Sequence, residues 1–231
     1  MHIPLSNRLK ACCKLVHAND RVADVGCDHG YLGIHLLKEH IATSIIAADI
    51  NEGPLQSAIR NAEKYGFKEQ MSFYLSDGAK NIPHNFDTLV CAGMGGDTMI
   101  SILEAAPWLK NPKYRLILQC QSRRPELRKY LYEQGYTILS ETLAKDSHFI
   151  YPVTEVIYSP TQALTPGQYY ITPALLASNS ELLPDFYQMV KSGLTKTFNA
   201  LSRTGGEKFE NLKIVLQELE EMEAQIYGNH C

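Results

Sequence analysis

The 231-residue sequence has no apolar run near the roughly 20 residues that span a membrane, and it does not open with a basic and apolar secretion signal. These absences predict a cytoplasmic protein with no membrane partner. The cysteines have neither the spacing of metal ligands nor the density of a disulfide scaffold, so we expect reduced thiols and no metal. They are Cys12, Cys13, Cys27, Cys91, Cys120 and Cys231.

Net charge is also small, because 22 Lys and Arg oppose 25 Asp and Glu. The overall charge therefore gives no argument for a nucleic acid partner, which must be inferred from local basic groups. Residues 1–172 hold 17 basic and 17 acidic side chains, and the remaining residues hold 5 and 8. Hydrophobic residues make up 45% of the chain, which is enough for the core of a globular protein.

Apolar runs alternate with amphipathic helical patterns over most of the chain. After a first helix within 6–16, we expect strands at 21–25, 44–49, 71–77, 86–93 and 114–121, with helices between and after them. This alternation predicts an α/β fold with a Rossmann-like, doubly wound parallel sheet that binds ligands at the carboxyl ends of its strands. Two further runs, 136–145 and 149–159, are separated by only three residues and predict a terminal antiparallel hairpin.

The composition changes at TQALTPGQYYITP, which has two prolines, a glycine and no charge. We therefore expect a first domain of residues 1–160, a linker of 161–172 and a second part of 173–231. Apolar stripes from Leu182 to Leu201 and from Phe209 to Ile226 are interrupted by TGG at 204–206. They predict a helical hairpin packed as an antiparallel coiled coil.

The stretch VADVGCDHGYLG is typical of a nucleotide-binding turn between a strand and a helix, yet it places Asp28 in the turn. A carboxylate there would repel a pyrophosphate, whereas it suits a ligand with a sulfonium and an ammonium group, such as S-adenosylmethionine. Asp49 and Asp77 follow the next two expected strands, where they could accept from a ribose and an adenine. Ordinary turn chemistry is the alternative for each aspartate.

The fourth expected strand ends in AGMGG, where nearly bare backbone suggests close approach to a ligand or a substrate base. LSNRL, VADVGCDHGYL, AADIN with GPL, SDG and AGMGG together resemble the bacterial tRNA adenine N1-methyltransferase family that modifies position 22. The resemblance covers nearly the whole chain and implies a methyltransferase sheet, bound S-adenosylmethionine and a tRNA substrate. One departure is LQCQSRRPELR, where a Gln-Pro segment is expected and only Gln119 matches.

The resemblance to this family implies transfer of a methyl group to N1 of a tRNA adenosine. Asp28 is the candidate catalytic residue, with a role in anchoring the methionine part or capping the turn left open. Another substrate for the same cofactor, or a non-catalytic RNA-binding module, also stays open, as does the oligomeric state, for which a monomer is one option. The predicted cofactor residues are Asp24, Gly26, Cys27, Asp28, His29, Gly30, Tyr31, Asp49, Ile50, Asp77, Gly78, Gly93 and Met94. The predicted substrate residues are Arg8, Gly95, Gly96, Gln119, Arg123, Arg124 and Arg128.

Overall fold

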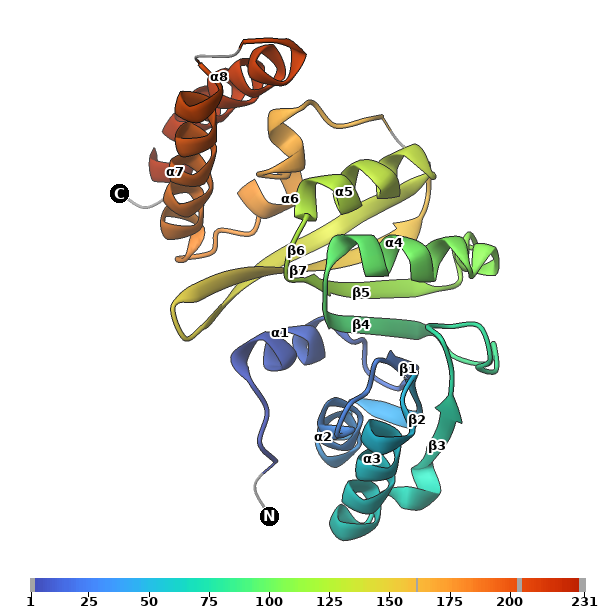
Figure 1. Ribbon diagram of the computed structural model, residues 1–231. Helices are drawn as coiled ribbons and strands as arrows, with labels where there is room; N and C mark the ends of the chain where they lie inside the picture. Colours follow the sequence, from blue (N-terminus) through green and yellow to red (C-terminus); the bar gives the residue numbers. More distant parts are fainter. Residues whose placement is uncertain (1–2, 161, 203–204, 229–231) are drawn as a thin grey trace.

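The computed structural model describes residues 3–160, 162–202 and 205–228 (Figure 1). The predictions made for Thr161, Thr204 and Cys231 lie outside the described residues. The described chain forms a seven-stranded sheet in the order β3-β2-β1-β4-β5-β7-β6. Its strands are β1 (Asp20–Val25), β2 (Ala42–Asp49), β3 (Met71–Leu75), β4 (Thr88–Met94), β5 (Arg115–Cys120), β6 (Tyr136–Asp146) and β7 (Phe149–Tyr158).

Strands β1 to β5 pair in parallel, and β7 runs antiparallel to both β5 and β6. This arrangement confirms the predicted Rossmann-like sheet with a terminal antiparallel hairpin. The helices of this part are α1 (Asn7–Leu15), α2 (Tyr31–Lys38), α3 (Glu52–Tyr65), α4 (Gly96–Glu104) and α5 (Arg124–Glu133). Short 3-10 helices occupy Lys68–Gln70, Pro107–Leu109 and Gly167–Tyr169.

The parallel strands are apolar runs because both faces of the sheet are covered by helices. Successive side chains of β1 point to opposite faces, so Val22 joins the core beneath α1, α2 and α3, while Ala23 joins the core beneath α4 and α5. Ile45 and Ile46 divide in the same way on β2. A two-sided core of this kind leaves only the strand ends open to ligands.

The C-terminal part contains α6 (Pro173–Leu176), α7 (Leu183–Leu201) and α8 (Glu207–Gly228) (Figure 1). Helices α7 and α8 form an antiparallel pair in which the Phe198 and Phe209 rings stack with centroids 4.5 Å apart. Their apolar core also includes Leu143 and Ile150 of the β6–β7 hairpin. The two predicted helices are present, whereas α6 was not expected. The division into domains of 1–160 and 173–231 stays a prediction.

Candidate functional site

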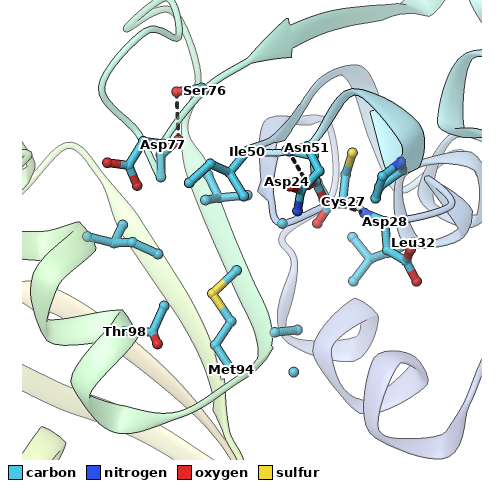
Figure 2. Close-up of a pocket in the computed structure, with 18 of the residues that line it drawn as sticks. Asp24, Cys27, Asp28, Leu32, Ile50, Asn51, Ser76, Asp77, Met94 and Thr98 are labelled. Carbon is cyan, nitrogen blue, oxygen red and sulfur yellow. Dashed lines mark hydrogen bonds between the residues drawn. The ribbon is translucent and has the colours of Figure 1, made fainter. Parts of the chain in front are cut away.

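A cavity of about 520 Å³ opens at the carboxyl ends of β1, β2 and β4, next to the loop after β3 (Figure 2). The strand order reverses between β1 and β4, which is where open α/β sheets bind ligands. All but one of the predicted cofactor residues line this cavity: Asp24, Gly26, Cys27, Asp28, His29, Tyr31, Asp49, Ile50, Asp77, Gly78, Gly93 and Met94.

The glycine turn brings β1 close to the neighbouring β4 loop. Gly26 has a φ of +74°, and a Cβ at this position would lie 2.2 Å from the Met94 terminal methyl group. Gly30, the predicted residue outside the lining, caps α2 with a φ of +69°. A Cβ on Gly30 would meet that of Ala58 at 3.0 Å, so this glycine serves helix packing behind the turn.

Asp49 holds the turn and the following loop together. Its Oδ2 accepts from the backbone N–H of Asp28 at 3.2 Å, and its Oδ1 accepts from the backbone N–H of Asn51 at 3.0 Å. The carboxylate is buried at the end of β2, and each oxygen keeps lone-pair capacity for a further donor. It can therefore accept from a ligand hydroxyl while it shapes the pocket.

Asp24 is a buried carboxyl in the cavity wall, only 5% exposed. Burial, reinforced by the negative charges of Asp49 and Asp28, raises the pKa of Asp24 from 3.8 to about 7. This acid is therefore part-protonated near neutral pH, and a cationic ligand group would favour its charged form. Burial also raises the pKa of the neighbouring Cys27 thiol, which keeps it protonated.

The other two acids lie at the cavity rim. Asp28 has a φ of +49° and an exposed side chain, 3.7 Å from Nε2 of His29. Asp77 is exposed and pairs with Lys80. Both side chains can turn toward a ligand, and the roles of Asp28 that the sequence left open stay open.

A buried side-chain amide supports the glycine-rich end of β4. Gln119 is fully buried, and its Oε1 accepts from the backbone N–H of Gly93 at 3.0 Å. Gly96 begins α4, where a Cβ would lie 2.5 Å from the Arg123 carbonyl oxygen. Both residues serve the packing of this segment, and the prediction that Gln119 and Gly96 bind substrate stays a prediction.

Five of the predicted substrate residues lie in three different environments. Arg8 of α1 lines the first cavity, with Nε 3.7 Å from Asp146 Oδ2. Gly95, Arg123 and Arg124 line a second cavity. Arg128 borders it but is only 3% exposed.

Arg128 is bound within the protein. Its guanidinium pairs with buried Glu141 and donates to the carbonyl oxygens of Tyr169 and Tyr170 at 3.0 and 2.8 Å. The contact between Arg128 and substrate stays a prediction, because the guanidinium is engaged within the protein and yet borders the second cavity. Arg128 joins the linker to the sheet. The sequence places it in a basic cluster, and nothing in that cluster predicts its pairing with Glu141, which is distant in the chain.

Several lining residues were missed by the sequence analysis. Leu32 is on α2, Asn51 lies between β2 and α3, and Ser76 follows β3. Thr98 of α4 also lines the cavity (Figure 2), as does Ile102 of the same helix. Their i and i+4 spacing in the helix after AGMGG is the one pattern that could have indicated a shared face.

Among the described residues, no three His, Cys, Asp or Glu side chains gather as a metal site requires. No helix of the described chain has the length and apolar character needed to cross a membrane.

Comparison with known proteins relates these features to one family. Residues 5–154 match the family described as a methyltransferase domain. The tRNA (adenine(22)-N(1))-methyltransferase of Bacillus subtilis is 34% identical over 152 residues, or 65% of this chain. The match spans 64% of that relative's length.

Solved structures extend the likeness to the C-terminal helices. A Streptococcus pneumoniae protein, Sp1610, in complex with S-adenosyl-L-methionine aligns with a TM-score of 0.82 and 29% identity, covering 94% of this chain and 99% of its own. The Bacillus subtilis m1A22 tRNA methyltransferase TrmK aligns with a TM-score of 0.79 and 25% identity, covering 99% of each chain.

Proposed function

The chain belongs to the methyltransferase-domain family and, within it, to the bacterial tRNA (adenine(22)-N1)-methyltransferases, and on this basis we propose that it methylates N1 of adenosine 22 in tRNA. S-adenosylmethionine is the methyl donor. The observation that carries the proposal is the acidic cavity at the topological switch of the sheet, with aspartates from three consecutive strand ends. The tRNA substrate places the activity in the cytoplasm.

The residues of the cavity fit this cofactor. Buried Asp24 and exposed Asp28 offer negative charge to the sulfonium and ammonium groups, which the positive end of a helix would otherwise disfavour. With the cofactor bound, Asp49 would accept from the ribose hydroxyls, and Asp77 and Gly78 would contact the adenine. Exposed Ile50 would offer the adenine an apolar surface. S-adenosylmethionine supplies an electrophilic methyl group at this site.

The chain's part in the reaction is positioning and electrostatics. Adenine N1 carries a free lone pair at neutral pH, so no strong general base is required. The protein must take the pairing edge of the adenine out of the tRNA and align it. Gly93 and Met94, supported by Gln119, line the cavity and would lie beside the transferred group. Asp28 can accept from the adenine amino group and offset the positive charge that develops on the base.

We assign the docking of the tRNA to local basic groups and to the C-terminal helices. Arg8 and Arg123 remain the candidate phosphate contacts of the rim. The α7–α8 pair has a small acidic excess, so we assign it contacts that depend on tRNA shape more than on charge. Because Leu143 and Ile150 share a core with these helices, point substitutions test this role better than truncation.

The test is incubation of the protein with labelled S-adenosylmethionine and unmodified total tRNA, followed by nucleoside analysis and mapping of the modified position. We expect 1-methyladenosine at position 22. A tRNA transcript with guanosine in place of that adenosine is the matched control and should stay unlabelled. Cofactor binding without methylation of any RNA would overturn the proposal and favour a non-catalytic binding module, and methylation at another position would overturn the assigned site.

A further inference from the structure

A second cavity, of about 640 Å³, lies between the β6–β7 hairpin, the start of α5 and helix α7. Its volume is within the range of about 300–1,000 Å³ typical of small-ligand sites. The function proposed above does not use it. The two cavities adjoin along the chain, because Met94 lines the first and the next residue, Gly95, lines the second.

The two cavities differ in charge. The first is lined by four aspartates, Asp24, Asp28, Asp49 and Asp77, against Arg8 and Lys80. The second is lined by Arg123, Arg124 and Arg128, with no carboxylate among its lining residues. An anionic group is therefore favoured in the second cavity and disfavoured in the first.

Arg124 is the available cation of the second cavity. Arg128 is engaged by Glu141, and Arg123 lies 3.2 Å from Asp97. Arg124 has no ion-pair partner within the described part of the chain; its guanidinium lies over the Phe186 ring, 5.2 Å from the centroid. Burial and the charge of Arg128 lower the pKa of Arg124, so this cation favours an additional anionic partner. A ligand phosphate would supply it.

Aromatic side chains form the facing wall. Phe149 and Tyr151, at the start of β7, lie with ring centroids 6.1 Å apart, and Phe149 is 59% exposed. Tyr170 borders the same cavity. An exposed ring with two part-buried ones, beside an arginine without an ion pair, is a combination that can hold a nucleotide, with its base stacked and its phosphate paired.

We propose that the second cavity holds one unpaired nucleotide of the tRNA, adjoining the nucleotide that is methylated. This inference rests on the proposed function. Its base stacks against Phe149 and Tyr151, and its phosphate pairs with Arg124. Because the cavities adjoin at Met94 and Gly95, an RNA strand can place its target base in the first and the neighbouring base in the second. The cavity thereby helps to draw the target out of the tRNA helix.

Gly193 of α7 offers a direct test. It lines the cavity, and a Cβ at Gly193 would meet no atom within 4 Å. Gly193→Phe therefore has room at its Cβ and brings a large side chain to the cavity wall, and it replaces a poor helix former, so the helix is retained. The matched control is Ser192→Phe, at an exposed neighbouring position outside the lining.

We expect Gly193→Phe to raise KM for tRNA about tenfold or more, as loss of one stacked base should. S-adenosylmethionine affinity, melting temperature and kcat should match the wild type, and Ser192→Phe should leave KM unchanged. Arg124→Met should raise KM and reduce the salt dependence of tRNA binding by about one counterion. An unchanged KM in Gly193→Phe, or the same rise in Ser192→Phe, would overturn the inference while wild-type methylation leaves the proposed function standing.

Transcripts that lack the base on the 5′ or the 3′ side of the target identify the occupant. Loss of the base that enters the cavity should raise the wild-type KM about as much as Gly193→Phe does, and combining the two changes should add little. Additive effects for both transcripts would show that no adjoining base occupies the cavity. A fall in kcat alone would assign the cavity to the chemical step and overturn the inference. A wild-type protein inactive on tRNA would instead refute the proposed function.

Discussion

Asp24→Asn should make the cofactor-free protein more stable, and by an amount that grows with pH. The folded-state pKa of Asp24 is about 7, against an ordinary value of 3.8, because the group is buried beside Asp49 and Asp28. Well below pH 3.8 the carboxyl is protonated in both the folded and the unfolded protein, so its ionisation costs nothing. As pH rises, the unfolded chain ionises first and folding stability falls until the folded-state pKa is passed.

The size of the effect follows from the shift. Each pKa unit corresponds to about 1.4 kcal/mol, so the wild type loses about 1.5 kcal/mol of stability by about pH 5 and about 4 kcal/mol by about pH 8. Asn has the shape of a protonated Asp and no charge to bury. The advantage of Asp24→Asn in free energy of unfolding should therefore grow by about 2.5 kcal/mol between these pH values.

Urea denaturation of the cofactor-free protein at both pH values measures this difference. Asp77→Asn is the matched control, because Asp77 is an exposed acid of the same cavity and its substitution removes no buried charge. The same Asp24→Asn protein should bind S-adenosylmethionine more weakly, since the charge that destabilises the empty site attracts the ligand. A stability difference that is the same at both pH values would refute the reasoning.

The other predictions concern single groups. Asp49→Ala removes the acceptor for the backbone N–H groups of Asp28 and Asn51 and for the ribose, so calorimetry should show S-adenosylmethionine affinity lower by about 1.5–3 kcal/mol, with an unchanged affinity contradicting the assigned pocket. Asp28→Asn should reduce single-turnover methylation and retain cofactor affinity if the carboxylate serves the target base; parallel losses would indicate an anchoring role, and near-wild-type values would indicate a turn cap. Arg128→Ala leaves buried Glu141 unpaired and should cost about 3–5 kcal/mol of unfolding free energy, measured by denaturation, with a loss near zero counting against the buried network. Burial raises the pKa of the Cys91 thiol to about 12, so mass spectrometry should find it unalkylated in the folded protein and modified after denaturation; rapid modification of the native protein would contradict the burial.

The sequence by itself determined the fold class and the position of the ligand cavity. Strands buried on both faces must be continuous apolar runs, and the crossover helices must be amphipathic, so both leave periodic patterns. The aspartates Asp28, Asp49 and Asp77 follow consecutive strands, and parallel strands end at one edge of the sheet. Their meeting was therefore predictable without coordinates.

The partners of individual side chains were decided by the tertiary structure. Arg128 and Arg124 are separated by one turn of a helix, yet one is buried against Glu141 and the other faces a cavity without a carboxylate. Likewise, Gln119 supports Gly93 from a neighbouring strand. Periodicity reports which face of an element is apolar, but not which distant carboxylate or peptide group lies opposite, because that depends on how the linker and α7 pack onto the sheet. The second cavity, whose walls come from five separate segments, exists only through that packing.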